Sequence, residues 1–179
     1  MALGRLGLVG AFTLATAFGI ADAHLYLGRG AGFWVSNVSS VWLFIPFVAG
    51  AILVTSRPSA ALLGLALTAV AFTAFYGWTA LQGASQFTSA DLRFLGGGLL
   101  TGPAFGLMGQ LWSERRRFVL GVPVGLAFVF EPYAWFRHVG RLPNPHLIWF
   151  TEAAFGGVLL LAFLALSVKA DRARSTPSV

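Results

Sequence analysis

Three carboxylates lie inside otherwise apolar stretches of the sequence, at Asp22, Glu131 and Glu152. A charged side chain at the centre of a bilayer costs on the order of 2.5 to 3.5 kcal/mol, so acidic residues in such stretches need an explanation. Asp22 lies near the end of one stretch, Glu131 near the end of another and Glu152 near the start of a third. If these stretches are helices that cross a membrane in alternate directions, the carboxylates lie at a similar depth, where they could bind the polar group of a small molecule.

Aromatic residues accompany these carboxylates. On a helix, Trp135 shares a face with Glu131, four residues earlier, and Trp149 lies three residues before Glu152. Such rings would form the walls of an outward-facing pocket, and the carboxylates would be its polar ligands. The predicted ligand-binding residues are Asp22, Glu131, Glu152, Tyr133, Trp135 and Trp149.

A proline directly after Glu131 favours such a cavity. Pro132 has no N–H to donate to the carbonyl of Phe128, so the helix bends there and a cavity could open. The opposing interpretation is structural: the aromatic residues form the belt that marks a membrane–water interface, and the carboxylates reach headgroup water or pair with Arg29, Arg137 or Arg141. The sequence leaves both interpretations open.

Most other chemistry is not indicated. The chain has no cysteine, which excludes disulfides, thiolate nucleophiles and cysteine-bound metals. Its histidines and intramembrane carboxylates lack the i, i+3 or i, i+4 spacing that places two metal ligands on one helix face, so no metal site, cofactor or catalytic residue is predicted. The net charge of +6 comes from basic residues in short connections, so no nucleic-acid partner is expected.

Composition identifies the elements that must position these residues. Of 179 residues, 57% are hydrophobic and 10% are charged, which indicates a chain surrounded by lipid rather than water. A helix that crosses about 30 Å of hydrocarbon needs roughly 20 apolar residues. Ser56 with Pro58 and, later, Asp91 are typical helix starts. Apolar stretches cover residues 6–25, 38–54, 60–81, 94–112, 118–136 and 147–168.

The basic residues predict the orientation. With a cytoplasmic amino terminus, eight lysines and arginines face the cytoplasm and four face outward, which the positive-inside rule favours. The predicted fold is an all-α polytopic transmembrane bundle of six helices with both termini cytoplasmic, in the inner (plasma) membrane. Residues 1–170 are predicted to form a single transmembrane domain, and residues 171–179 a disordered cytoplasmic tail. One rival stays open: Arg5, the apolar run after it and the Ala-Asp-Ala triplet at 21–23 also fit a signal peptide.

Small residues recur every four positions in two of these stretches, which places them on one helix face. Such faces let helix backbones approach closely in lipid, where apolar side chains alone give little drive for association. The main prediction is packing within the bundle, and the alternative is that the face on the first helix docks a partner subunit in the membrane. The predicted helix-packing residues are Gly7, Ala11, Ala15, Gly19, Gly98, Gly102 and Gly106.

Three segments carry a resemblance to a known family: residues 41–51 (VWLFIPFVAGA), 75–78 (FYGW) and 102–112 (GPAFGLMGQLW). They resemble a family of uncharacterised actinobacterial integral membrane proteins, and the resemblance covers most of the chain and includes Glu131. It implies the six-helix architecture and no particular activity.

The expected architecture is also similar to that of the substrate-binding components of energy-coupling-factor vitamin transporters. The similarity rests on size, six helices, cytoplasmic termini, an outer polar pocket and the pair Ala11 and Ala15 on the first helix. In that family, the alanine motif contacts the transmembrane coupling protein and the ligand binds near the outer surface. The chain carries no vitamin-specific signature, so the similarity names no substrate.

The leading functional hypothesis is a membrane-embedded component that binds or transports a small molecule through an outer-leaflet polar pocket. Its expected partners are the lipid bilayer, a small-molecule ligand and a membrane partner subunit. Two alternatives remain: an accessory subunit that stabilises a larger membrane complex through its glycine-rich helices, and a membrane enzyme in which paired carboxylates act as acid and base on a lipid.

Overall fold

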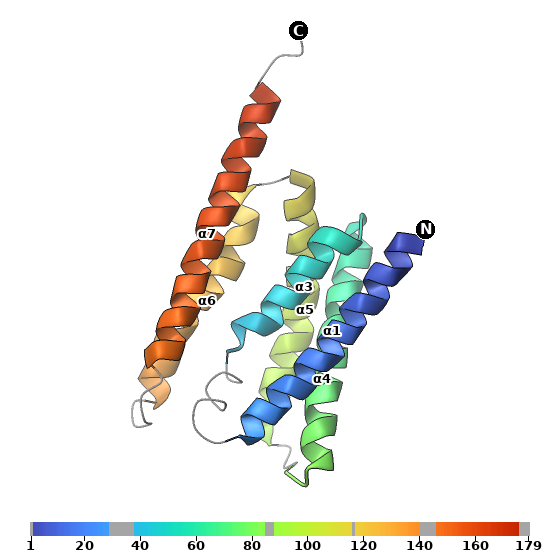
Figure 1. The fold of residues 1–179 in the computed structure, drawn as a ribbon, viewed down its shortest axis with the longest axis vertical. Helices are drawn as coiled ribbons and strands as arrows, with labels where there is room; N and C mark the ends of the chain where they lie inside the picture. The colour runs from blue at the N-terminus through green and yellow to red at the C-terminus, as the bar shows by residue number, and fades with distance from the viewer. Residues whose placement is uncertain (1, 29–37, 85–87, 116, 140–145, 176–179) are drawn as a thin grey trace. The chain divides into compact units, whose positions relative to one another are not determined.

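The computed structural model of the chain describes residues 2–28, 38–84, 88–115, 117–139 and 146–175, without the side chains of residues 2–5, 89–90, 134–139, 146 and 174–175. These residues form six helices and no strand, which confirms the predicted all-α class and the number of helices (Figure 1). The helices are α1 (Ala2–Leu27), α3 (Ser40–Leu53), α4 (Arg57–Leu81), α5 (Ser89–Arg115), α6 (Phe118–Val139) and α7 (His146–Ser175).

Three of these helices are long and apolar enough to cross a membrane: α1 over Leu6–Leu27, α4 over Arg57–Leu81 and α7 over Leu147–Ala173. The other helices depart from the uniform spans expected from the sequence. Helix α3 has 14 residues, and at 1.5 Å per residue its length of roughly 21 Å falls short of a 30 Å hydrocarbon layer. Helix α5 has 27 residues, but its many glycines dilute its hydropathy.

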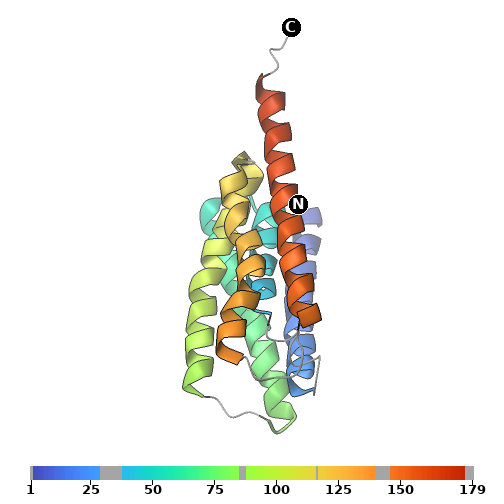
Figure 2. The same cartoon turned by 90° about the vertical axis from the view of Figure 1, so that its left-hand side faces the viewer.

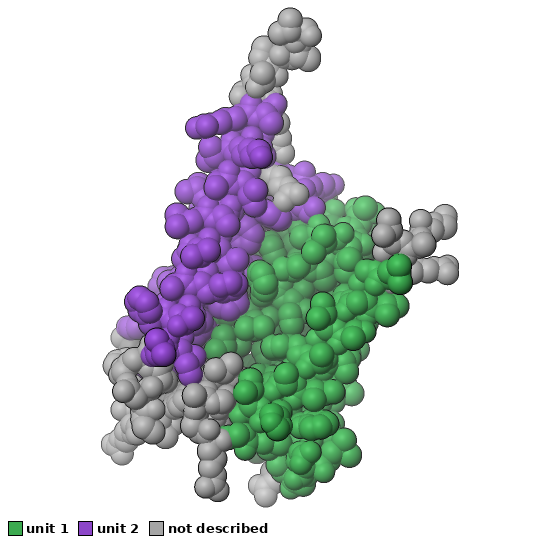
Figure 3. All heavy atoms as spheres, viewed as in Figure 1, with its two compact units in different colours: residues 1–110 green, residues 111–179 purple. Residues whose placement is uncertain are grey.

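The chain divides into two compact units, residues 1–110 (unit 1) and residues 111–179 (unit 2) (Figure 3). That residues 1–170 form a single domain stays a prediction. Helix α7 continues to Ser175, so the first part of the expected tail, residues 171–175, is helical.

Unit 1 is built around α4, against which α1 and α3 pack. A Cβ atom at Gly19 of α1 would overlap the carbonyl of Ala71 on α4, so this glycine is what allows the two backbones to approach. Ala15 and Ala23 on the same helix are fully buried. Helices that meet through small residues gain dense van der Waals contact at short interaxial distance, which is the usual way helices associate in lipid.

Helix α5 meets α3 and α4 through glycines. A Cβ at Gly50 of α3 would overlap the carbonyl of Gly106 on α5, and a Cβ at Gly106 would overlap the carbonyl of Ala60 on α4. A Cβ at Gly64 of α4 would likewise overlap the carbonyl of Gly102. The obstacles are backbone atoms, which no change of rotamer can move aside. The sequence of α5 therefore fixes how closely these three helices pack.

The turn between α4 and α5 is defined by local hydrogen bonds. Helix α4 ends at Leu81, and Gly83, two residues later, has a φ of 71°, in the left-handed region that favours glycine. Thr88 then forms a capping box with Asp91: the Thr88 N–H and hydroxyl donate to one Asp91 oxygen at 2.7 and 2.5 Å. The Tyr76 hydroxyl donates to the other oxygen at 3.1 Å, which links the end of α4 to the start of α5. Asp91 therefore lies in the first turn of α5 and caps its start, as predicted.

This cap should make stability depend on pH in the acid range. Hydrogen bonds from Thr88 hold the pKa of Asp91 below its ordinary value of 3.8, so the folded state binds a proton less readily than the unfolded chain. The stabilisation is thus fully present above about pH 4 and is lost as the pH falls through the lowered pKa. We expect Asp91→Asn to melt below wild type by a constant margin from pH 7 to about pH 5, and this margin to shrink toward pH 3. A margin that stays constant down to pH 3 in parallel thermal melts would contradict the assignment.

Unit 2 contains the α6–α7 hairpin, in which the two helices run side by side in both views (Figures 1 and 2). Glycines again face larger groups across the contact: Gly121 of α6 lies against the ring of Phe163, and Gly125 lies against Leu160. Trp112, at the end of α5, contacts the Phe163 ring edge-on at 5.2 Å. The hairpin is therefore held by ring and aliphatic side chains seated on a glycine face.

Candidate functional site

An aromatic cluster fills the part of unit 1 where α1, α3, α4 and α5 meet. The Trp42 indole of α3 stacks on the Phe72 ring of α4 with centroids 4.5 Å apart, and contacts the Phe94 ring of α5 edge-on at 6.0 Å. Phe18 of α1 meets the same indole edge-on at 5.0 Å. Trp42 and Phe72 are almost completely buried. Such ring pairs contribute about 0.5 to 1.5 kcal/mol each beyond the area they bury.

Asp22 fixes the orientation of this indole. The Trp42 side chain donates a hydrogen bond to the Asp22 carboxylate, which is buried on α1. Because the indole N–H is the only polar group of tryptophan, this bond leaves the rest of the ring system free to serve as an apolar wall. Asp22, one of the predicted ligand-binding residues, thus holds the Trp42 ring in place.

A hollow of about 290 Å³ opens beside the aromatic cluster. This volume lies at the lower end of the range for small-molecule sites, which is about 300 to 1,000 Å³. Three helices contribute to its wall, so the hollow is a product of the tertiary fold of unit 1. Its lining residues are Ser39, Trp42, Leu43, Thr68, Phe72, Arg93, Phe94, Gly97, Gly98 and Thr101.

The wall of this hollow is apolar except at a few points. Arg93 is exposed and carries the one formal charge among the lining residues. Among the described residues, no hydrogen-bond or ion-pair partner of its guanidinium is found. Thr101 donates its hydroxyl to the Gly97 carbonyl of its own helix at 2.9 Å, so this group is already satisfied. The hollow therefore offers aromatic faces together with one available cation.

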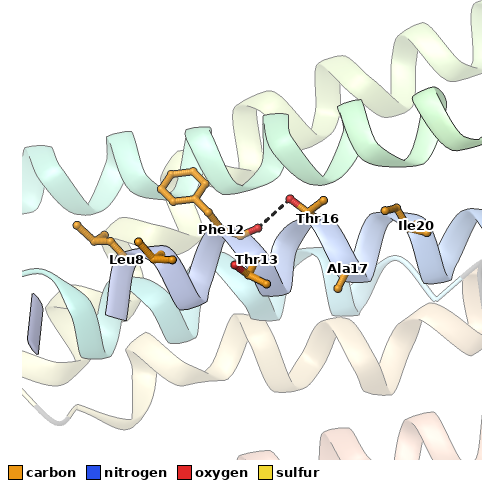
Figure 4. A pocket seen from close by; sticks show the side chains of 7 residues that line it. Leu8, Phe12, Thr13, Thr16, Ala17 and Ile20 are labelled. Atoms are coloured by element: carbon orange, nitrogen blue, oxygen red, sulfur yellow. Dashed lines mark hydrogen bonds between the residues drawn. The ribbon is translucent and has the colours of Figure 1, made fainter. Parts of the chain in front are cut away.

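Two other hollows in unit 1 lack this combination. One, of about 330 Å³, lies between α1 and α3 and is lined almost entirely by apolar groups, including the predicted packing residues Gly7 and Ala11. The other, of about 600 Å³, runs along α1 alone, and Figure 4 shows its side chains on that single helix. Thr16 there donates to the carbonyl of Phe12 at 2.9 Å, so its hydroxyl is engaged within the helix. Neither hollow presents a charged group.

Unit 2 contains a separate pair of carboxyl groups. Glu131 of α6 and Glu152 of α7 share a side-chain hydrogen bond. Glu152 is 7% exposed, and its Oε1 atom is buried with no hydrogen-bond partner. A hydrogen bond between two carboxyl groups requires a proton on one of them, because an ionised carboxylate only accepts.

Comparison with known proteins places the chain in a family. The model of a family described as "Family of unknown function (DUF6518)" matches residues 7–179. The chain belongs to the DUF6518 family. No curated protein and no solved structure matches it. This result agrees with the resemblance to an uncharacterised family noted from the sequence; the actinobacterial origin and the similarity to energy-coupling-factor components stay predictions.

The structure of this DUF6518 chain brings together some of the predicted ligand-binding residues. Glu131 and Glu152 are in direct contact in unit 2, whereas Asp22 belongs to unit 1 and bonds to Trp42. Tyr133 is 58% exposed. Trp149 is partly buried on α7, three residues before Glu152, and the side chain of Trp135 lies outside the described residues. Their assignment as ligand-binding residues stays a prediction.

The residues that surround the unit 1 hollow were not predicted from the sequence. Thr68, Phe72 and Phe94 are not among the predicted ligand-binding residues, and Arg93 is one of the four basic residues that the predicted orientation places outside. One signal was available: Arg93 and Phe94 lie near the start of one predicted helix and Trp42 near the start of another. If the helices cross the membrane in alternate directions, these two run the same way, which puts the cation and both rings at a similar level. The packing of α3 against α5, which brings Trp42 next to Phe94, cannot be predicted from the periodicity of either helix.

Proposed function

We propose that this protein binds a small amphipathic anion in the hollow between α3, α4 and α5 of unit 1. The ligand class is an aromatic or branched apolar body that carries one carboxylate or phosphate group. The observation that carries the proposal is that Trp42, Phe72 and Phe94 border the same hollow as the exposed guanidinium of Arg93. Rings would contact the ligand body, and Arg93 would pair with its anionic group.

The size and chemistry of the hollow favour this class over others. At about 290 Å³ it suits a compact molecule rather than a whole phospholipid. Its apolar walls would gain little from a polar sugar or peptide, whose groups would lose water without finding partners. A neutral apolar molecule would find equally good surroundings in the bilayer, so the guanidinium is what would make binding in the hollow favourable.

The proposal is tested with the purified full-length protein in detergent. We expect phenylacetate to raise the melting temperature in a dose-dependent manner, because a ligand that binds only the folded state stabilises it. The neutral analogue phenylacetamide has the same shape and should give a much smaller shift. Arg93→Gln should abolish the difference between the two compounds, whereas Arg117→Gln, an exposed arginine of unit 2, should preserve it. A panel of aryl and branched-chain carboxylates and phosphates that leaves the melting temperature unchanged would refute the proposal.

Two neighbouring glycines provide a steric test of the site. Gly97 lines the hollow, and a Cβ added there meets nothing within 4 Å, so Gly97→Leu would fill the hollow without disturbing the helix contacts. Gly96 also has open space around its Cβ but does not line the hollow. We expect Gly97→Leu to lose ligand-induced stabilisation at least tenfold in apparent affinity and Gly96→Leu to retain it, as measured by thermal shift. Equal responses of the two variants would place the ligand elsewhere.

We further propose that the chain is polytopic with both termini in the cytoplasm, as the distribution of basic residues favours. On this orientation, Gln82 after α4 faces outward and Arg117 before α6 faces the cytoplasm, and the hollow opens in the outer half of the membrane. Because the chain has no cysteine, single Gln82→Cys and Arg117→Cys variants can be labelled without background. A membrane-impermeant maleimide added to spheroplasts should label only Gln82→Cys. Labelling of Arg117→Cys alone would reverse the orientation.

A further inference from the structure

One buried hydroxyl of unit 1 departs from a pattern seen elsewhere in the chain. Helical hydroxyls that donate to the backbone carbonyl four residues earlier, at 2.7 to 2.9 Å, belong to Thr16, Thr73, Thr101, Thr151 and Ser167. Thr68 of α4 is 4% exposed, and its Oγ1 atom is buried with no hydrogen-bond partner among the described residues. A hydroxyl that is removed from water without a partner destabilises the folded state, so Thr68 needs an explanation.

Thr68 lines the hollow between α3, α4 and α5, at the end away from Arg93. Its hydroxyl lies beside Gly102 of α5, where a Cβ would overlap Oγ1. At 1.5 Å per residue, Gly102 lies roughly 13 Å along α5 from Arg93. The Phe72 ring meets α5 at Gly98, between these two levels. The hollow therefore has a cation toward one end, a hydroxyl toward the other and an aromatic wall between them.

The Thr68 hydroxyl can turn toward the hollow without any movement of the backbone. The methyl group of this side chain, Cγ2, lies 3.4 Å from the Cβ position of Gly98, which also lines the hollow. Rotation to another staggered rotamer moves the hydroxyl to the position that the methyl now occupies. Other polar groups on this wall are already bonded within the protein, since Thr101 donates to Gly97 and the Trp42 indole donates to Asp22. Thr68 is therefore well placed to bond to a ligand.

We propose that the ligand of this hollow is an aromatic acid with a hydroxyl group on its ring, opposite the acidic group, and that this hydroxyl bonds to Thr68. The inference rests on the proposed anion site and specifies which ligands that site prefers. With the carboxylate at Arg93 and the ligand ring beside Phe72 and Phe94, the far edge of the ligand points toward Thr68. The bond gives a partner to both hydroxyls, whereas a ligand without the group leaves Thr68 unpaired, and a site of this kind discriminates against such a ligand.

The test compares two ligands of the same shape, 4-hydroxyphenylacetate and 4-methylphenylacetate, by thermal shift of the purified full-length protein in detergent. We expect the wild type to bind the hydroxyl compound roughly tenfold more tightly, as judged from the dose dependence of the melting temperature. Thr68→Val, which replaces the hydroxyl by a methyl group, should remove this preference. Thr68→Ser keeps a hydroxyl and should preserve it. Thr101→Val changes another threonine of the hollow, whose hydroxyl is bonded within α5, and should also preserve the preference.

The outcomes separate this inference from the proposed anion site. Thr68→Ala provides a second variant if the added methyl group of Thr68→Val disturbs the contact with Gly102, because it removes the hydroxyl without adding atoms. A wild type that phenylacetate stabilises but that binds the hydroxyl and methyl compounds equally well would overturn the inference and leave the anion site standing. A preference that survives in both Thr68→Val and Thr68→Ala would do the same. If none of the three compounds changed the melting temperature, the anion site itself would fall, and this inference with it.

Discussion

Gly106→Leu should abolish the folded form of unit 1. A Cβ at this position would overlap the Ala60 carbonyl and come within 3.1 Å of the Gly64 Cα, both on α4. Overpacking of this kind costs about 1 to 3 kcal/mol when side chains can adjust, and more when backbone atoms are in the way. We expect a loss of at least about 3 kcal/mol, seen as loss of the monodisperse peak in size-exclusion chromatography and a large fall in melting temperature.

Gly96→Leu is the matched control for this prediction. It places the same side chain on the same helix, at a position where a Cβ meets nothing within 4 Å. Glycine is about 1 kcal/mol less favourable than alanine inside a helix, so a leucine there should not lower stability. If both variants lost the same stability, the effect would come from adding leucine to α5 and not from the close contact of α3, α4 and α5.

Trp42→Ala should be the most damaging truncation in the core of unit 1. Removing a buried tryptophan leaves a cavity that costs about 3 to 5 kcal/mol, and this indole contacts rings from three other helices. The change also removes the donor to the buried Asp22 carboxylate, which adds about 1 to 3 kcal/mol for an unpartnered group. We expect little folded protein at 37 °C and, in detergent, a strongly lowered melting temperature.

Trp42→Phe separates the two contributions. Phenylalanine keeps most of the ring contacts but cannot donate to Asp22, so its loss of stability should be less than half that of Trp42→Ala. Adding Asp22→Asn to each variant then tests the hydrogen bond, since an amide lacks the charge that makes a missing donor costly. If Asp22→Asn changed the stability of Trp42→Phe and of wild type by the same amount, Asp22 and Trp42 would not be coupled.

The helices of this protein were readable from sequence because apolar length and helix punctuation are local properties. Asp91 forms a capping box with Thr88 at the start of α5. At the start of α4, the Ser56 hydroxyl accepts a hydrogen bond from the Ser59 N–H at 3.3 Å. The lengths of the helices were harder to predict. The apolar stretch 38–54 predicts a full membrane span, whereas α3 covers only Ser40–Leu53. Hydropathy shows that a stretch is apolar, but it does not show whether the helix formed there is long enough to cross a bilayer.

The candidate sites were only partly readable because they depend on which helices pair. The antiparallel order of the last two stretches placed Glu131 and Glu152 at one level, and the two side chains are in contact. The same reasoning predicts that Asp22 contacts a ligand, and this stays a prediction; in the structure its carboxylate accepts a hydrogen bond from Trp42. Nothing local distinguishes these cases, since each is an acidic residue on a glycine- or alanine-rich helix. The glycine contacts that bring α5 against α3 and α4 are tertiary, and they create the hollow beside Arg93.

Photoaffinity labelling tests the central claim of an anion-binding hollow most directly. The full-length protein would be irradiated with an aryl diazirine that carries a carboxylate, digested, and mapped by mass spectrometry. We predict that the label attaches to α3, α4 and α5 at or beside Trp42, Phe72 and Phe94, and that excess phenylacetate suppresses it while phenylacetamide does not. Labelling that is spread over the helices in proportion to their apolar surface, and is insensitive to phenylacetate, would contradict the account.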